Sequence, residues 1–295
     1  MMYDTVVYRP PREATSPLLP VTAGCSHNKC SFCNMYRGVP FKVYPRERIR
    51  VYLSEFQKYY PHATRIYLVG GDPFVLSAPK LHDICDDIEE FMPQVKTITM
   101  YASVKNIINK SDEDLKALRA RGINQLYLGL ETGWDELLTY LCKGSTAAEA
   151  VTQLNRLTAA GITYGVIIMT GLAGHGKGIE NAKHTAALMN QIHARVLYCN
   201  SLVIMEDTPL GQARREGTYV EAGEYERIEE LLTLFKELKP KSKLLVNSYH
   251  VSNALNINAE VPDEQQETIE RLENFLASTT PEEMERRFHR QDMNI

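Results

Sequence analysis

The apolar residues of the chain follow two spacings, and the alternation of these spacings predicts its elements. Short runs rich in Val, Ile, Tyr and Thr recur between longer stretches whose apolar residues repeat every three or four positions. The short runs predict strands at 18–24, 65–71, 97–103, 124–131, 163–171 and 194–204, and the longer stretches predict helices at 47–60, 81–92, 112–122, 146–161 and 179–192. A repeated strand–helix–strand unit of this length implies parallel strands joined by right-handed crossovers.

Capping residues support the predicted helix ends. Ser111 is a suitable N-cap for the helix that ends at Gly122, and glycine is common just after a helix. Thr146 and Glu149 have the spacing of a capping box, and that helix ends at Gly161. An N-cap residue therefore precedes each of these two predicted helices, and a glycine ends it.

The pattern changes after Pro209. Helical periodicity predicts helices at 225–238 and 263–276, with one short strand at 243–247, and a last helix that Thr280 and Pro281 open. We expect an N-terminal extension (1–17), an α/β catalytic core (18–210) and a mainly helical elaboration (211–295). The core has fewer units than the eight of a closed (β/α) barrel, which leaves a partial barrel or an open doubly wound sheet.

Composition and charge narrow the class of protein. The chain has 295 residues, of which 44% are hydrophobic and 24% charged, and its formal net charge is −4. These values are typical of a folded globular protein and make nucleic acid an unlikely partner. The N-terminus lacks the pattern of a secretion signal, and the longest apolar stretch, around Val166–Met169, is too short to cross a membrane. We therefore expect a cytoplasmic protein with reduced thiols, in which clustered cysteines indicate metal binding.

Three of the six cysteines lie close together in GCSHNKCSFCNMY, which follows the first predicted strand. Cys25, Cys30 and Cys33 have the spacing C-x4-C-x2-C. Each iron of a [4Fe–4S] cluster needs one thiolate, so three cysteines leave one iron open to an outside ligand. A structural zinc site with His27 as the fourth ligand is the alternative, although such sites usually join two distant cysteine pairs. The remaining cysteines, Cys85, Cys142 and Cys199, are expected to be small buried residues.

The cysteine loop resembles that of the radical S-adenosylmethionine (SAM) superfamily, whose commonest spacing is C-x3-C-x2-C. LVGGDPF (68–74) is similar to the GGEP-like motif of that superfamily, with Asp72 in place of Glu. YLGLETGWDELLTYLCKG (127–144) resembles a segment of its elongator-type, MiaB-type and coproporphyrinogen-oxidase-type branch, as do MTGLAGHGKG, SLVIMEDTPLG and YHVSN. The resemblance covers roughly residues 18–277 and implies a partial (β/α)6 barrel, [4Fe–4S] and SAM as cofactors, and an electron donor such as flavodoxin or ferredoxin.

The same resemblance implies roles for particular residues. Cys25, Cys30 and Cys33 would hold the cluster, and Phe32 would lie against the adenine of SAM. The backbone of Gly70, Gly71, Asp72 and Pro73 would meet the methionine amino group, since glycines allow a close approach of the backbone. Taken alone, GGDP is more often only a turn.

Further candidates lie at the ends of the predicted strands. Glu131 would bind a ribose hydroxyl or cationic SAM, or else be a solvated charge, and Ser103 is a weaker candidate for the same pocket. Leu202 and Val203 would offer backbone contacts to adenine, or else belong to a plain buried strand. The segment 171–178 holds four glycines and would form a turn beside SAM or a phosphate cradle before a helix.

Residues for substrate contact are expected at strand ends and loops: Tyr101, Lys143, His175, Asn200, His250 and Asn253. His250 and Asn253 are the preferred pair because they fall in the YHVSN motif. The sequence predicts a radical SAM enzyme that cleaves SAM reductively and abstracts hydrogen from a small organic substrate, such as a porphyrin. It shows no cobalamin-binding region ahead of Cys25 and no second cysteine cluster. The alternatives are an iron–sulfur electron carrier or sensor and, less favoured, a zinc-stabilised binding module.

Overall fold

The computed structural model describes Tyr3 and residues 6–288 of the chain, which divide into two compact units. The first unit comprises Met1–Asn28, Met35–Gly129 and Gln153–Tyr164. The second comprises Lys29–Asn34, Leu130–Thr152 and Gly165–Ile295. The division does not follow the predicted boundaries at residues 17 and 210, and that division into an extension, a core and an elaboration stays a prediction.

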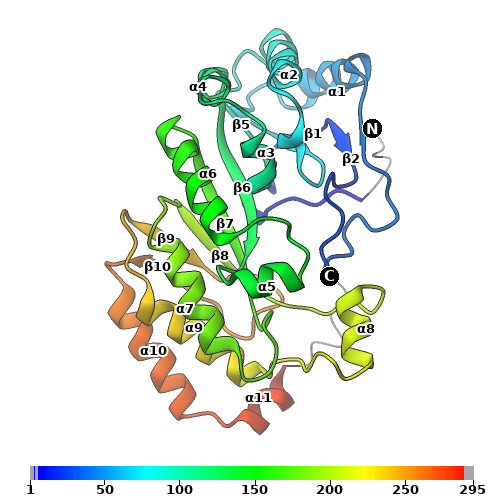
Figure 1. Cartoon of the computed structure of the whole chain (residues 1–295). Coiled ribbons are helices and arrows are strands. Elements are labelled where there is room, and N and C mark those ends of the chain that lie inside the picture. The colour runs from blue at the N-terminus through cyan, green and yellow to red at the C-terminus, as the bar shows by residue number, and fades with distance from the viewer. Residues whose placement is uncertain (1–2, 4–5, 289–295) are drawn as a thin grey trace. The chain divides into compact units, whose positions relative to one another are not determined.

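The first unit is built mainly from parallel strands and the helices that connect them, with one short antiparallel pair (Figure 1). Its strands are β1 (Leu18–Pro20), β2 (Thr22–Ala23), β3 (Lys42–Val43), β4 (Arg65–Val69), β5 (Thr97–Ala102) and most of β6 (Ile123–Glu131). Its helices are η1 (Pro11–Glu13), α1 (Arg46–Tyr59), η2 (Pro73–Val75), α2 (Ala78–Phe91), α3 (Val104–Ile108), α4 (Asp112–Ala120) and the second half of α6 (Ala147–Ala159). β1 pairs with β4, β4 with β5 and β5 with β6, all in parallel.

The second unit continues the alternation of strands and helices. Its strands are β7 (Thr163–Thr170, from Gly165 on), β8 (Val196–Ser201), β9 (Leu244–Asn247) and β10 (Asn258–Val261), and its helices are α5 (Asp135–Tyr140), α7 (Gly178–Met189), α8 (Pro209–Arg215), α9 (Glu224–Glu237), α10 (Gln265–Ala277) and α11 (Pro281–Arg287). β7, β8 and β9 are parallel, and β10 returns antiparallel to β9. Helix α9 packs along α7 and also contacts α10 (Figure 1).

The predicted α/β class and the parallel strands are confirmed, and this is the fold of a partial (β/α)6 barrel. The capping boxes at Ser111 and Thr146 are present, and Thr280 caps α11 in the same way. Local hydrogen bonds between residues three positions apart fix these helix starts, which is why the sequence could predict them.

Several expectations were wrong. The predicted first strand is two short strands, because Val21 separates β1 from β2, and β2 pairs antiparallel with β3. β10 was missed because its exposed and buried residues alternate over only four positions.

Cys142 is exposed rather than buried, since it lies in the turn after α5 with a φ of 56°. Cys85 and Cys199 are buried, as expected, and burial raises the pKa of the Cys85 thiol to about 12.

The first unit contains a cluster of tyrosines and an ion pair whose carboxylate is buried. The ring of Tyr101 makes edge contacts with Tyr67 and Tyr127, at centroid distances of 5.9 and 6.2 Å. Glu13 of the N-terminal segment is fully buried and accepts hydrogen bonds from Arg65 and Tyr127. Tyr101, predicted to contact substrate, is thus part of an aromatic cluster.

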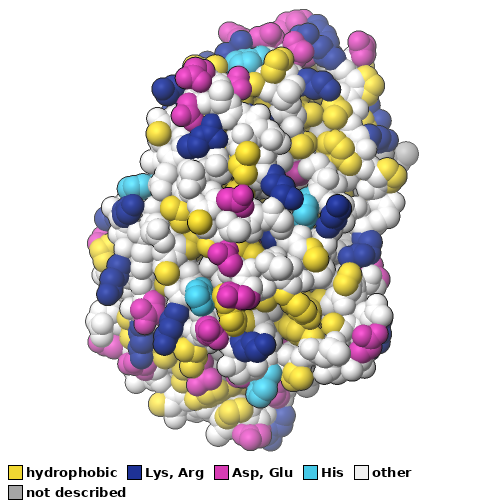
Figure 2. Space-filling view, in the orientation of Figure 1, with side chains coloured by type: hydrophobic (Ala, Val, Ile, Leu, Met, Phe, Trp, Pro, Cys, Tyr) yellow, Lys and Arg dark blue, Asp and Glu magenta, His cyan; other side chains and the backbone are white. Residues whose placement is uncertain are grey.

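Charged side chains of both signs are interspersed over the face that Figure 2 shows. This mixture agrees with the small net charge of −4. Within the described residues, no helix combines the length and the apolar character that a membrane span requires. The basic stretch 286–290 lies partly outside the described residues.

Candidate cofactor site

The GGDP turn of the first unit holds the chain on both sides of Cys25. The Gly71 amide donates to the Gly24 carbonyl at 2.9 Å, and the Asp72 carboxylate accepts from the Ser26 amide at 2.8 Å. A second Asp72 oxygen accepts a short hydrogen bond from the Ser26 hydroxyl. Asp72 is 4% exposed, so water competes little with these bonds. The two motifs that the sequence singled out therefore form one structure around Cys25.

Close packing makes glycine necessary at this turn. A Cβ at position 71 would lie 2.6 Å from the Cβ of Cys25, and a Cβ at position 70 would lie 1.9 Å from the hydroxyl of Thr22. The Thr22 hydroxyl is buried and, in the described part of the chain, has no hydrogen-bond partner. A buried hydroxyl without a partner is costly, which suggests that a polar ligand group satisfies it. The turn thus fits the expected amino group of SAM.

Helix α3 and the residues after it donate hydrogen bonds to the GGDP turn and to the residue that follows it. Asn106 donates to Asp72 at 3.4 Å, and the Lys110 ammonium donates to the Phe74 carbonyl at 2.6 Å. Lys110 is buried, and its burial lowers the pKa of the ammonium to about 8. Ser103 caps α3 through a capping box with Asn106, so its side chain has a local structural role. Sequence reasoning missed Asn106 and Lys110.

In the second unit, the backbone of Ser31 fixes the turn that carries Cys30 and Cys33. The Ser31 amide donates to the Leu141 carbonyl at 3.0 Å, and its carbonyl accepts from the Leu210 amide at 2.9 Å. The ring of Phe32 packs against an apolar cluster of the second unit, whose buried members are Leu137, Leu141, Leu172, Ala173, Leu202, Ile204, Leu210 and Tyr219. Phe32 and Leu202, both expected near adenine, therefore meet at the same cluster.

Glu131 and Lys143 form an ion pair in the second unit. The Lys143 ammonium lies 3.1 Å from the Glu131 carboxylate and 6.0 Å from the centre of the Phe32 ring. Burial opposes the charge on Lys143, but Glu131 and the Cys30 and Cys33 thiols raise the pKa of Lys143. Glu131 is 8% exposed and has a φ of 70°, so it is not a solvated charge at a strand end. This left-handed conformation costs a non-glycine residue about 1–2 kcal/mol.

The glycine-rich segment after β7 is held by side chains of the C-terminal part. Glu230 accepts from the Gly171 amide at 2.7 Å, and Glu226 accepts from the Gly176 amide at 2.8 Å. Burial raises the pKa of Glu230 to about 7 despite the bonds that it accepts. Carboxylates therefore already take two amides of this segment, which favours the expected turn over the phosphate cradle. His175 is exposed and lies 3.0 Å from Glu226.

The predicted pair His250 and Asn253 lies in the loop after β9. Asn253 donates from its amide to the carbonyls of Cys199 and Ser248 at 2.8 and 2.6 Å. His250 lies 2.7 Å from the Ser252 hydroxyl, and burial lowers the pKa of its imidazole. The bond from Asn253 to the Cys199 carbonyl connects the loop to β8. The carbonyl of Asn200 accepts from the Thr170 hydroxyl at 3.4 Å, within paired strands.

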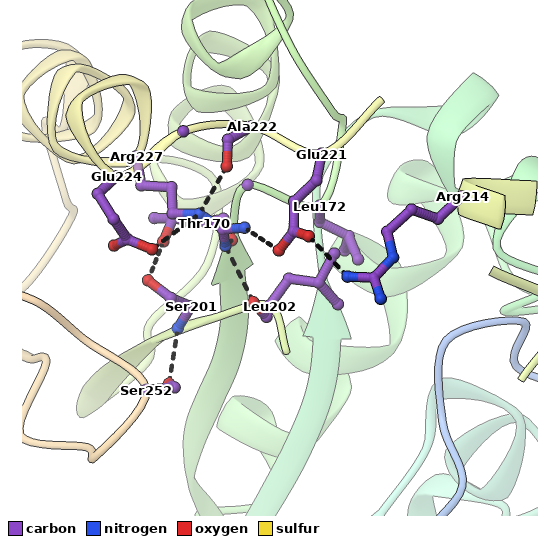
Figure 3. Close-up of polar contacts among 12 residues, drawn as sticks. Thr170, Leu172, Ser201, Leu202, Arg214, Glu221, Ala222, Glu224, Arg227 and Ser252 are labelled. Atoms are coloured by element: carbon purple, nitrogen blue, oxygen red, sulfur yellow. Dashed lines mark hydrogen bonds and ion pairs between the residues drawn. The ribbon is translucent and has the colours of Figure 1, made fainter. Parts of the chain in front are cut away.

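Arg227 is a further residue that the sequence reasoning missed. It lies on α9, is 2% exposed and donates to the carbonyls of Thr170 and Leu202 (Figure 3). Leu202, expected to offer its backbone to adenine, therefore already uses its carbonyl, and its amide donates to Thr170. A signal was present in the sequence, because Arg227 falls on the apolar stripe with Leu231 and Leu234.

Residues 19–187 match the family model of the Radical SAM superfamily, which is more than half of the chain. The chain belongs to the radical SAM superfamily. Its cofactors are accordingly a [4Fe–4S] cluster and SAM. Three cysteines within nine positions of the sequence fit a cluster, and within the first unit a glycine turn that holds Cys25 and a buried Thr22 hydroxyl without a partner in the described residues fit SAM.

Individual proteins are similar to the chain at lower identity. The heme chaperone HemW of Lactococcus lactis is 26% identical over 198 residues, which cover 65% of this chain and 50% of that protein. The radical SAM methyltransferase TsrM of Kitasatospora setae superposes with a TM-score of 0.55 at 16% identity, covering 66% of this chain and 38% of TsrM. Methylornithine synthase superposes with a TM-score of 0.51 at 18% identity, covering 88% of this chain and 80% of the synthase chain. The chain thus spans half the length of the curated relative, and the two structures support the fold alone.

Proposed function

We propose that the chain is an enzyme that cleaves SAM reductively and removes a hydrogen atom from a small organic substrate. Cys25, Cys30 and Cys33 would hold the cluster. The observation that carries this proposal is the pair of bonds that the GGDP turn makes to Gly24 and Ser26, on either side of Cys25. A turn that only reverses the chain has no need of this attachment, whereas a turn that presents SAM to a cluster does.

When held by the three cysteines, a [4Fe–4S] cluster would supply the one electron needed to cleave SAM into methionine and a 5′-deoxyadenosyl radical, which would take hydrogen from the substrate. The residues of the chain bind and orient. Gly71 and Asp72 hold Cys25, and the backbone of Ser31 holds the Cys30–Cys33 turn. The Thr22 hydroxyl and the glycine backbone would receive the methionine amino group.

The proposed contacts with the ribose, the sulfonium and the adenine of SAM rest on the charge of Glu131 and on the apolar cluster around Phe32. Glu131 would accept a ribose hydroxyl or face the cationic sulfur, and Lys143 fixes its carboxylate. Phe32 and Val203 would contact adenine, since Phe32 packs on the apolar cluster that contains Leu202. Substrate contacts from Tyr101, His250 and Asn253 remain proposals, with Asn253 restricted by the two carbonyls to which it donates.

The partners in this proposal are a small-molecule substrate and an electron donor of the flavodoxin or ferredoxin class. A one-electron donor is needed because the reaction consumes one electron for each SAM that is cleaved. We place the reaction in the cytoplasm, where reduced thiols and such donors are available.

The test is an anaerobic reconstitution of the protein with iron and sulfide. SAM and dithionite are then added, and 5′-deoxyadenosine is measured, with Cys33→Ala as control. We expect product in the parent and none in the variant, and about four irons per chain in the parent alone. A verified cluster that neither binds nor cleaves SAM would overturn the proposal in favour of an electron carrier or sensor.

A second candidate function is the transfer of heme, because the named relative is a heme chaperone. Hemin titration of the same reconstituted sample separates the two functions. Saturable heme binding at one site, with SAM bound but no 5′-deoxyadenosine formed, would support the chaperone function. Deoxyadenosine formation without specific heme binding would support the enzyme.

A further inference from the structure

The buried guanidinium of Arg227 connects the carboxyl ends of two neighbouring strands in the second unit. Arg227 of α9 donates to the carbonyl of Thr170, the last residue of β7, at 3.1 Å and to the carbonyl of Leu202, just after β8, at 3.0 Å (Figure 3). The same side chain also donates to the Ala222 carbonyl at 3.1 Å and to Glu221 at 2.9 Å. A planar fork with several fixed donors is the property that arginine has and lysine lacks.

The residues around Arg227 leave space for its guanidinium and pair with its charge. A Cβ at position 171 would lie 2.3 Å from a terminal nitrogen of Arg227, so Gly171 leaves the space that the side chain occupies. Arg214 lies 3.1 Å from the second oxygen of Glu221, which in turn holds Arg227 (Figure 3). The charge is thus buried with a carboxylate partner and three carbonyl acceptors, which limits the cost of its burial.

The bond to Leu202 determines the direction of the next amide. A trans peptide is planar, so the carbonyl of one residue and the N–H of the next point in opposite directions. Because Arg227 holds the Leu202 carbonyl, the N–H of Val203 must point away from the guanidinium. The Leu202 amide, which belongs to the preceding peptide, is also fixed by its 3.0 Å bond to the Thr170 carbonyl, so the peptides on both sides of the Leu202 Cα are held by hydrogen bonds.

We propose that Arg227 is a positioning residue for SAM, which orients the Val203 amide toward the adenine by holding the Leu202 carbonyl. The inference rests on the proposed function, which assigns Val203 to the adenine contact. The inference also gives helix α9 a role in cofactor binding, although α9 lies beyond residues 19–187, which match the family model.

The experiment compares Arg227→Lys with the parent and with Arg65→Lys, all as anaerobically reconstituted holoprotein. Arg65→Lys is the control because Arg65 also binds a buried carboxylate, that of Glu13, but lies in the first unit. SAM affinity is measured by equilibrium dialysis. Methionine binding is followed through the EPR spectrum of the reduced cluster, since methionine lacks the adenine.

We expect Arg227→Lys to weaken SAM binding about tenfold or more while methionine still perturbs the EPR spectrum as in the parent. Arg65→Lys should leave SAM binding near the parent value. Equal losses of SAM affinity in both variants, or an equal loss of methionine binding in Arg227→Lys, would reduce Arg227 to a structural role and overturn the inference. Unchanged SAM binding in Arg227→Lys would also overturn it.

A second measurement needs no variant and covers the case in which Arg227→Lys does not fold. Hydrogen exchange of the parent holoprotein is followed with and without SAM. We expect SAM to slow exchange at the Val203 amide, and the absence of protection there would overturn the inference. A parent that has its cluster but does not bind SAM would overturn the proposed function itself, whereas a parent that binds SAM without these effects overturns only the role of Arg227.

Discussion

The carboxylate of Asp72 accepts a hydrogen bond from the backbone amide of Ser26 at 2.8 Å, across 46 positions of sequence. Ser26 directly follows Cys25, and Asp72 belongs to the GGDP turn. The aspartate side chain therefore acts on the cysteine loop. A glutamate here, as in the commoner form of the motif, would be longer by one methylene group.

We predict that Asp72→Asn weakens the hold on the cysteine loop. An amide keeps one acceptor oxygen and places a donor opposite either Ser26 or Asn106, which both donate to Asp72. The free energy of unfolding should fall by about 1–3 kcal/mol, and less iron should be bound after reconstitution. Denaturant unfolding and iron analysis measure both. Asp86→Asn on the exposed side of α2 is the control, and a full iron content in Asp72→Asn would contradict the prediction.

We predict that Gly71→Ala prevents assembly of the cluster. The added Cβ would lie 2.6 Å from the Cβ of Cys25, so the loop must shift, at a cost of about 1–3 kcal/mol. Gly38→Ala is the matched control, because Gly38 has a φ of 77° but no atom within 4 Å of an added Cβ. Absorption at visible wavelengths after reconstitution should be lost in Gly71→Ala and kept in Gly38→Ala. The reverse order would refute the steric argument.

We predict opposite effects of Thr22→Val on stability and on binding. Thr22 buries a hydroxyl with no partner in the described structure, so replacing it with a methyl group should raise the free energy of unfolding of the SAM-free protein by about 1 kcal/mol. If the hydroxyl receives the amino group of SAM, the affinity for SAM should fall several-fold. Chemical denaturation and equilibrium dialysis test the two effects, and unchanged affinity would remove Thr22 from the site.

We predict a stability contribution from Lys110 that changes with pH. Burial lowers the pKa of Lys110 from 10.5 to about 8 in the folded protein. Between these values the unfolded chain binds the extra proton, so stability from this group rises with pH, by at most about 1.4 kcal/mol per unit. Below about pH 8 the burial cost is present in full.

The test of this prediction compares the parent with Lys110→Met. Free energies of unfolding are measured from about pH 7.5 to about pH 9.5. The parent should gain stability relative to the variant as the pH rises. The loss of the bond to the Phe74 carbonyl adds an offset that does not vary with pH. A constant difference over this range would show that Lys110 titrates normally.

The sequence by itself determined the order and type of most elements. Strand and helix periods depend on neighbouring residues, and so do the capping boxes at Ser111 and Thr280. The three cysteines of the cofactor loop were also visible, because their spacing lies within nine positions. These features are local, and a local pattern can be read without knowledge of the fold.

Only the tertiary structure decided which polar groups meet across long sequence separations. Nothing near Asp72 in the sequence indicates Ser26, and nothing near Arg227 indicates the carbonyls of Thr170 and Leu202. The sequence shows that Arg227 places a charge on the apolar stripe of α9. It does not show which groups accept hydrogen bonds from that charge. A buried charge needs partners with defined geometry, and the sequence does not specify which distant residues the fold will bring to it.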